Sequence, residues 1–216
     1  LAVPDPMTAS THAFDAQLRS RIAQNLGDHD RHAIDEPQLR HAAVAISVVP
    51  TPNGNAAFLL TRRDAGLRSH SNQYALPGGR LDPGEGPIDA ARRELHEEVG
   101  VASTPGAVLG SLDDYRTRSG YVITPVVVWL DDIATLAPQP GEVDEIHVID
   151  LDELDRPDSP RWITIEESSR RVLQLPLRNR LIHAPTGALL YQFREVALWG
   201  RTVRTDVVEE PVWAWR

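Results

Sequence analysis

The chain has 216 residues, a hydrophobic content of 41% and a formal net charge of −9. This length fits one globular domain with a terminal extension, and the acidic balance argues against general binding to nucleic acid or to a membrane surface. Because the chain has no cysteine, disulfides, thiolate metal sites and cysteine nucleophiles are excluded. All 22 basic residues are arginine, so arginine must supply any permanent side-chain cation that contacts a phosphate.

Residues 1–40 are expected to form a peripheral N-terminal extension of a domain that spans residues 41–216. Within the extension, a short amphipathic helix ending at Gly27 is predicted by apolar residues that recur at four-residue intervals, namely Phe14, Leu18, Ile22 and Leu26. The polar stretch 28–38 is interpreted as a linker. Its histidines are expected to be solvated rather than metal ligands, because no metal-ligand spacing repeats there.

A β-hairpin is predicted next. His41–Val49 is rich in β-branched residues and is followed by a turn with two prolines and Asn-Gly, after which Ala57–Thr61 returns as a second strand. Residues 62–73 show no apolar periodicity and are interpreted as a loop, which leads through residues 74–76 to a Pro-Gly-Gly turn.

The stretch Gly78–Val101, GGRLDPGEGPIDAARRELHEEVGV, is the most informative part of the chain. Its first half is a loop, because four of five consecutive positions from Pro83 to Pro87 are Pro or Gly. Its second half predicts a helix that begins near Pro87 and stops at Gly100.

Three carboxylates on that helix, Glu94, Glu97 and Glu98, are spaced i, i+3, i+4 and therefore share one face. Like charges repel, and the helix macrodipole favours cations at this end. A hard divalent cation such as Mg²⁺, which prefers oxygen ligands, would offset them. The alternative is a solvated acidic face without a ligand.

The remainder alternates strands and loops. Strands are predicted at Ala107–Arg116, Tyr121–Leu130, Glu145–Asp150, Arg161–Ile165, Arg171–Leu175 and Leu189–Phe193. A C-terminal helix is expected within Arg194–Val207, with Trp199 in the core. This order predicts an α+β fold in which a mixed sheet lies between helices.

The stretch resembles the Nudix box, the motif of hydrolases that act on a nucleoside diphosphate linked to another group. All of its fixed positions match: Gly79, Glu85, Arg93, Glu94, Leu95, Glu97, Glu98, Gly100 and Val101. The resemblance implies a loop–helix–loop in an α/β/α sandwich. It also implies that Glu94 and Glu98 are the chief metal ligands and that Glu97 is a further ligand or the base. Arg93 and Glu85 would orient the glutamates.

The same resemblance implies hydrolysis of a phosphoanhydride bond assisted by Mg²⁺ or Mn²⁺. The general base stays open among the three helix glutamates and a later acid. Glu142, Asp144 and Glu145 follow a loop that could reach the site and add a carboxylate, and His96, at a variable position of the box, is expected to face solvent.

The segment Leu59–Gly79, LLTRRDAGLRSHSNQYALPGG, is similar to the element upstream of the box in coenzyme A pyrophosphatases. Arg63 and Arg68 fall in register with it and would bind substrate phosphates, although the simpler alternative is surface charge on a loop. The positions that depart from the element are Asp64, Asn72 and Leu76.

Three functions stay open. The first is hydrolysis of coenzyme A or acyl-CoA to 3′,5′-ADP and (acyl-)4′-phosphopantetheine. The second is hydrolysis of another nucleoside diphosphate derivative such as ADP-ribose or NADH, and the third is non-catalytic ligand sensing. We expect a CoA-like nucleotide as partner, allow for a homodimer, and expect neither nucleic acid nor membrane. No leader and no apolar run of spanning length is seen, so a cytoplasmic protein is expected.

Overall fold

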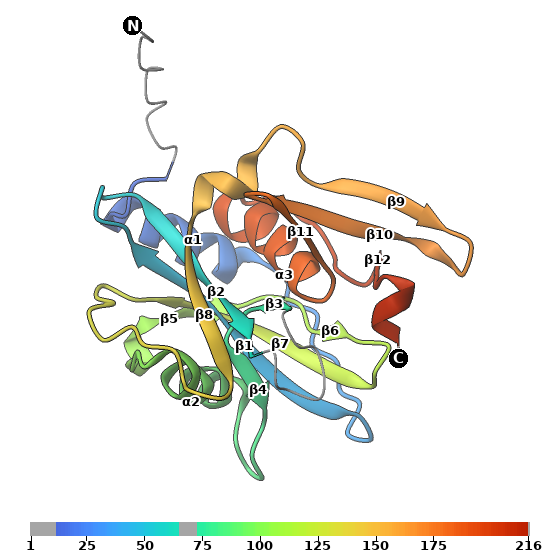
Figure 1. Ribbon diagram of the computed structural model, residues 1–216, viewed down its shortest axis with the longest axis horizontal. Helices are drawn as coiled ribbons and strands as arrows, with labels where there is room; N and C mark the ends of the chain where they lie inside the picture. Colours follow the sequence, from blue (N-terminus) through green and yellow to red (C-terminus); the bar gives the residue numbers. More distant parts are fainter. Residues whose placement is uncertain (1–11, 65–72, 216) are drawn as a thin grey trace, which may run out of the picture.

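The computed structural model describes residues 12–64 and 73–215 (Figure 1). Its centre is a mixed eight-stranded sheet in the order β3–β2–β1–β7–β5, in which β4 also pairs with β1, β6 with β7 and β8 with β2. The strands are β1 (Arg40–Pro50), β2 (Ala56–Arg63), β3 (Tyr74–Ala75), β4 (Gly78–Arg80), β5 (Val108–Ser111), β6 (Tyr115–Arg116), β7 (Tyr121–Trp129) and β8 (Val143–Asp150).

Helices cover both faces of this sheet. The helix α2 (Pro87–Val99) packs on one face, while α1 (Ala16–Asp28) and α3 (Thr186–Gln192) lie on the other (Figure 1). The arrangement confirms the predicted α+β class and its α/β/α layering. The hairpin of β1 and β2, the helix of the box and the central position of β7 agree with the sequence prediction.

The alternation of side chains along β1 and β2 explains why two helical layers form. On β1, Ala43 and Ala45 face the core under α2, whereas Ile46 faces the core under α1 and α3. On β2, Leu59 faces the core under α2, and Leu60 faces the core under α1 and α3. A strand that is apolar at consecutive positions is buried on both faces, so each face requires its own cover.

The N-terminal helix belongs to the main core, and the expected peripheral position of this segment is wrong for α1. Leu18, Ile22 and Leu26 are buried in the same cluster as the residues of β1 and β2. The linker that follows is also anchored. The His29 side chain is 4% exposed and its Nε2 lies 2.9 Å from the Asp113 carboxylate, so this histidine is not solvated as expected.

The C-terminal region differs from the sequence prediction. Leu189–Phe193 is not a strand but lies in α3 and at the start of the π-helical turn η3 (Phe193–Leu198), so the C-terminal helix ends before most of the predicted range 194–207. Apolar runs of this length do not distinguish a buried strand from a buried helix. Trp199 is 39% exposed rather than in the core, and its indole N–H donates to Asp155.

A smaller four-stranded sheet lies beside α3. Its strands β10 (Ser168–Leu177), β9 (Arg161–Ile165), β11 (Arg180–His183) and β12 (Val208–Glu209) follow the order β11–β10–β12, with β9 on β10. Short 3₁₀ turns occupy η1 (Pro105–Ala107), η2 (Leu151–Asp155) and η4 (Val212–Trp215). Within residues 12–64 and 73–215, none of the helices combines the length and apolarity that crossing a bilayer requires.

The core position of α1 can be tested by truncating Ile22, which is fully buried. Ile22→Ala should lower the free energy of unfolding by about 2–5 kcal/mol, because the change removes buried methyl groups and leaves a cavity. Ile163→Ala, on a strand and 40% exposed, is the control and should cost less than about 1 kcal/mol. Urea titration measures both, and equal losses would place α1 outside the core.

Candidate active site

The orientation of α2 is set at both of its ends and along its apolar face. Pro87 occupies the first turn, and Gly100 closes the helix in the left-handed conformation at φ 75°. Ala91 and Leu95 are fully buried against the sheet. The glutamates of the box therefore lie along the edge where α2 meets β4, and His96 is exposed as predicted.

Arg93 joins most of the carboxylates of the box. Its Nη1 lies 2.8 Å from Glu94 Oε1 and 3.0 Å from Glu97 Oε2, while its Nη2 donates to Glu85 Oε2 at 2.9 Å. Hydrogen bonds from Arg93 lower the pKa of Glu85. The structure thus brings Glu94 and Glu97 together with the two residues expected to orient them, Arg93 and Glu85, and the Arg93 guanidinium lies at the centre.

Glu98 lies deeper than the other helix glutamates. Burial raises the pKa of its carboxyl to about 7, opposed by a backbone N–H of Gly78 and by Arg63, and the negative charges of Glu94 and Glu142 add to the increase. Burial likewise raises the pKa of Glu94, against the effect of Arg93. The two carboxylates therefore crowd negative charge into a partly dry space.

Two glycines let β4 approach α2 this closely. A Cβ at Gly79 would overlap the Glu94 carboxylate, and a Cβ at Gly78 would overlap the backbone of Ala43 and Val44 on the paired strand β1. The Gly78 N–H also points at Glu98 Oε2, 3.3 Å away. The Gly-Gly pair is therefore a spatial requirement of the carboxylate cluster.

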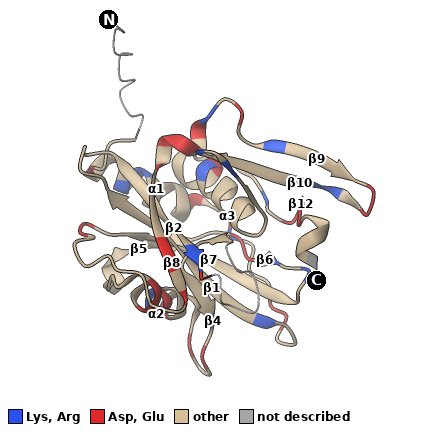
Figure 2. Ribbon diagram, in the orientation of Figure 1, with Lys and Arg blue, Asp and Glu red and all other residues tan. Residues whose placement is uncertain are grey.

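Arg63, at the end of β2, reaches the same cluster. Its Nη1 lies 3.9 Å from Glu98 Oε1. Its neighbour Arg62 instead pairs with Asp144 at 2.5 Å and Glu145 at 3.2 Å. Figure 2 shows the arginines at the end of β2 beside the acidic segment of β8, with the acidic segment of α2 below them.

The later acids that the sequence singled out divide between two places. Asp144 and Glu145 are held by Arg62, whereas the charge of Glu142 acts on both Glu94 and Glu98. Glu142 is thus the later acid that faces the cluster. Arg68 lies outside the described residues, and its predicted contact with substrate stays a prediction.

The donor set of this cluster fits a divalent cation, although in the described part of the chain no three acidic or histidine side chains already converge on one point. Glu94 and Glu98 offer carboxylate oxygens, which Mg²⁺ and Mn²⁺ prefer. Burial disfavours both as anions, and nearby carboxylates add to the effect, namely Glu97 and Glu142 at Glu94 and Glu94 and Glu142 at Glu98. A cation would relieve that cost. Their assignment as ligands, with Glu97, stays a prediction.

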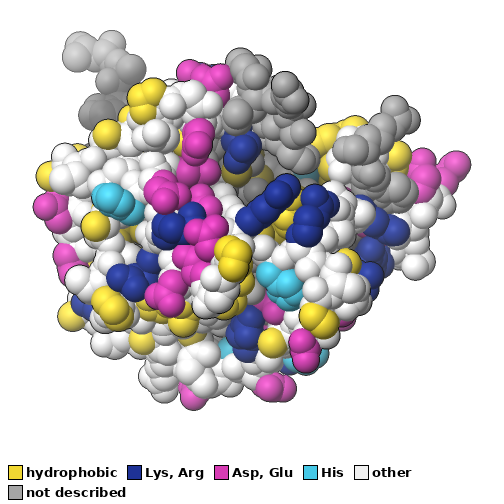
Figure 3. All heavy atoms as spheres, turned by 90° about the horizontal axis from the view of Figure 1, so that it is seen from below, with side chains coloured by type: hydrophobic (Ala, Val, Ile, Leu, Met, Phe, Trp, Pro, Cys, Tyr) yellow, Lys and Arg dark blue, Asp and Glu magenta, His cyan; other side chains and the backbone are white. Residues whose placement is uncertain are grey.

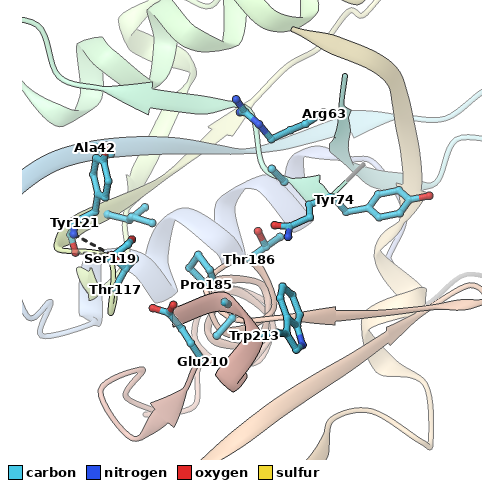
Figure 4. Close-up of a pocket in the computed structure, with 15 residues that line it drawn as sticks. Ala42, Arg63, Tyr74, Thr117, Ser119, Tyr121, Pro185, Thr186, Glu210 and Trp213 are labelled. Carbon is cyan, nitrogen blue, oxygen red and sulfur yellow. Dashed lines mark hydrogen bonds between the residues drawn. The ribbon is translucent and has the colours of Figure 1, made fainter. Parts of the chain in front are cut away.

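A hollow adjoins the cluster. On the face seen from below, where α2 and the β4–α2 loop lie, acidic and arginine side chains gather over the middle of the molecule (Figure 3). Arg63 also lines a pocket of about 230 Å³ between the main sheet and the C-terminal part of the chain (Figure 4). The arrangement suits a substrate with a polyanionic centre and a group attached to it.

The NUDIX domain family matches residues 40–171, which is well over half of the chain. The chain belongs to the Nudix family. Nudix hydrolases act on nucleoside diphosphates linked to another group and generally use divalent metal ions such as Mg²⁺ or Mn²⁺, which agrees with the carboxylates on α2. The likeness extends from the start of β1 to β10 and leaves α1 outside.

Curated Nudix proteins resemble this one at moderate identity. An uncharacterized Nudix hydrolase NudL from Photorhabdus laumondii is 35% identical over 159 residues, which cover 72% of this chain and 84% of that protein. Nudix hydrolase 3 from Caenorhabditis elegans is 32% identical over 67% of this chain and 64% of its own length. The names of these two proteins give the family but no substrate.

A solved structure shows the shared fold. The MutT/nudix family protein from Enterococcus faecalis matches with a TM-score of 0.54 at 18% identity, over 78% of this chain and 66% of its own. This likeness concerns the fold alone and carries no information on substrate.

The close approach of Gly79 to Glu94 generates a prediction. Gly79→Ala should reduce kcat about 10²-fold or more, because the added methyl group displaces the Glu94 carboxylate from the cluster. Stability should change little, since the displaced atoms are the end of a flexible side chain. Gly106→Ala is the control, because its nearest neighbour would be Thr104 Oγ1 at 4.0 Å. Steady-state kinetics measure kcat of both variants. A wild-type kcat in Gly79→Ala would show that activity does not depend on the close approach of Gly79 to Glu94.

Proposed function

We propose that this Nudix hydrolase cleaves the diphosphate of coenzyme A or acyl-CoA, giving 3′,5′-ADP and (acyl-)4′-phosphopantetheine. The observation that carries the proposal is the position of Arg63. This residue is in register with the upstream element of coenzyme A pyrophosphatases, contacts the buried Glu98 and lines the adjoining pocket. It supports a site in which the diphosphate lies at the carboxylate cluster and an attached group extends into the pocket.

In this proposal the residues of the chain have distinct tasks. Glu94 and Glu98, with Glu97, hold the divalent cation, and Arg93 with Glu85 keeps Glu94 and Glu97 in position. When bound, the cation neutralises charge on the diphosphate and lowers the pKa of a coordinated water. Arg63 binds a phosphate oxygen at the entrance of the pocket. The proton of the attacking water passes to a carboxylate among Glu94, Glu97, Glu98 and Glu142.

The requirement for a cation can be tested with conservative variants. Glu94→Gln and Glu98→Gln should each lose at least about 10²-fold in kcat, and EDTA should abolish wild-type turnover without unfolding the protein. Both variants should be as stable as wild type or slightly more so, because a disfavoured negative charge is removed. Glu167→Gln, at an exposed turn, is the control. Full activity in excess EDTA would refute the metal requirement.

The substrate is decided by a panel of CoA, acyl-CoAs, ADP-ribose, NADH and diadenosine polyphosphates, with the products identified by mass spectrometry. CoA or an acyl-CoA should give the highest kcat/KM. A preference for ADP-ribose or NADH would replace the coenzyme A assignment with the second function. Absence of turnover on every member would favour ligand sensing.

The arginines allow a sharper test that compares CoA with dephospho-CoA, which lacks the 3′-phosphate. Arg63→Ala should lower kcat/KM about 10- to 150-fold on both substrates, because the contact of Arg63 with Glu98 supports a role at the diphosphate, which both substrates share. Arg68→Ala should affect CoA more than dephospho-CoA if Arg68 binds the 3′-phosphate. Arg161→Ala, on β9 and remote from α2, is the control. A loss confined to CoA in Arg63→Ala would reassign Arg63 to the 3′-phosphate.

A further inference from the structure

The pocket beside the carboxylate cluster is built from parts of the chain that are far apart in sequence. Arg63 of β2 lies on one side, and Pro185, Glu210 and Trp213 lie on the other (Figure 4). Glu210 and Trp213 belong to the last seven residues, beyond the match to the NUDIX domain, which ends at residue 171. The wall opposite the arginine therefore lies outside the part of the chain that matches the NUDIX domain.

The two sides of the pocket differ in charge. Arg63 provides a cation at the side next to Glu98. Glu210 provides an acid on the other side, where its residue is only 3% exposed. The walls between them are mostly apolar, with Ala42, Ile123 and Ala184 among the lining residues. An anion is thus favoured at the Arg63 side and disfavoured toward Glu210.

The acidic wall is held in place before any ligand binds. The Arg118 backbone N–H donates to Glu210 Oε1 at 2.9 Å. The adjacent Glu209, on β12, accepts from Arg118 Nη2 at 2.5 Å and Arg170 Nη2 at 2.9 Å. Although burial opposes it, hydrogen bonds from Arg118 and Ser168 lower the pKa of Glu209 to about 2. This ion-paired strand fixes the position from which Glu210 faces the pocket.

Trp213 completes the same wall. Its ring packs edge-on against His183 of β11 with the ring centroids 5.6 Å apart, yet the residue as a whole is 57% exposed. An indole that is supported at one edge and open beside a pocket offers apolar area to a ligand at small conformational cost.

We propose that this pocket binds the uncharged, amide-containing chain attached to one phosphate of the substrate, and that Glu210 and Trp213 select this chain over groups that carry further negative charge. This inference rests on the proposed function, because in coenzyme A the chain is the pantetheine arm. Apolar walls suit its methylene and methyl groups, and Glu210 accepts from its amide N–H groups. The adenosine end carries the 3′-phosphate, which Glu210 repels, and stays outside the pocket.

The two products of coenzyme A hydrolysis separate the two ends of the substrate. Calorimetric titration of the full chain with 4′-phosphopantetheine and with 3′,5′-ADP measures each dissociation constant without turnover. Trp213→Ala should raise the dissociation constant of 4′-phosphopantetheine about 10-fold. It should change the dissociation constant of 3′,5′-ADP by no more than about twofold. Trp199→Ala is the matched control, because Trp199 is also partly exposed but does not line the pocket, and it should leave both constants unchanged.

Other outcomes overturn the proposal in distinct ways. A loss of affinity for 3′,5′-ADP alone would assign the pocket to the adenosine end, and unchanged affinity for both products would remove it from the binding site. Turnover of coenzyme A by the wild-type enzyme is measured in a separate assay, which tests the proposed function itself. An enzyme that ignores coenzyme A but hydrolyses ADP-ribose refutes the proposed function, whereas an enzyme that hydrolyses coenzyme A with an unaltered Trp213→Ala variant refutes only the pocket assignment.

The role of the Glu210 charge has its own test. Titration at about pH 8, where a carboxyl is ordinarily ionised, compares 4′-phosphopantothenate with its primary amide, which differ in one negative charge at the end of the chain. Wild type should bind the amide at least about 10-fold more tightly, and Glu210→Gln should reduce that preference to about threefold or less. An unchanged preference in Glu210→Gln would exclude selection by this acid. Circular dichroism confirms that each variant is folded.

Discussion

Crowding of negative charge between α2 and the sheet is the constraint on which the site depends. Glu94 and Glu98 lie next to Ala91 and Leu95, the residues through which α2 packs on the sheet, so the packing of the helix carries both carboxylates toward the interior. Arg93 offsets part of this charge, because its guanidinium bonds three carboxylates, those of Glu85, Glu94 and Glu97. Within residues 12–64 and 73–215, the carboxylate of Glu98 forms an ion pair with Arg63 alone, at 3.9 Å. The excess of negative charge that is left favours a bound cation.

The sheet supplies the rigidity that such crowding requires. The strand β4 pairs with β1 over Gly78–Arg80, which fixes Gly79 against Glu94, and β2 carries Arg63 to the cluster from the other side. Arg63 and Gly79 are thus mounted on two strands of one sheet, β2 and β4, and both meet the carboxylates of α2. A site of this kind loses activity through small displacements more readily than through loss of folding.

Sequence patterns predicted the parts of the fold that local chemistry decides. Pro87 and Gly100 delimited α2 because caps act locally, and the fixed spacing of the box identified the glutamates that Arg93 joins. Contacts between residues far apart in the chain leave no local sequence pattern, so they were not predicted. The apolar run at Leu189 suited a strand as well as the helix it forms, and the pairing of His29 with Asp113 joins positions 84 residues apart. Glu210, which forms the acidic wall of the pocket, belongs to no sequence motif and so was not predicted.

The parallel pairing of β1 with β7 has a consequence for how the protein folds. Arg40 pairs with Tyr121, 81 positions further along the chain, and the register continues to Val48 and Trp129. The hairpin, the box loop and α2 all lie within this crossover. A contact of such long range is slow to form because the loop entropy must be overcome first. Because α2 packs on both β1 and β7, the helix that carries the glutamates gains its full support during synthesis only after β7 has left the ribosome.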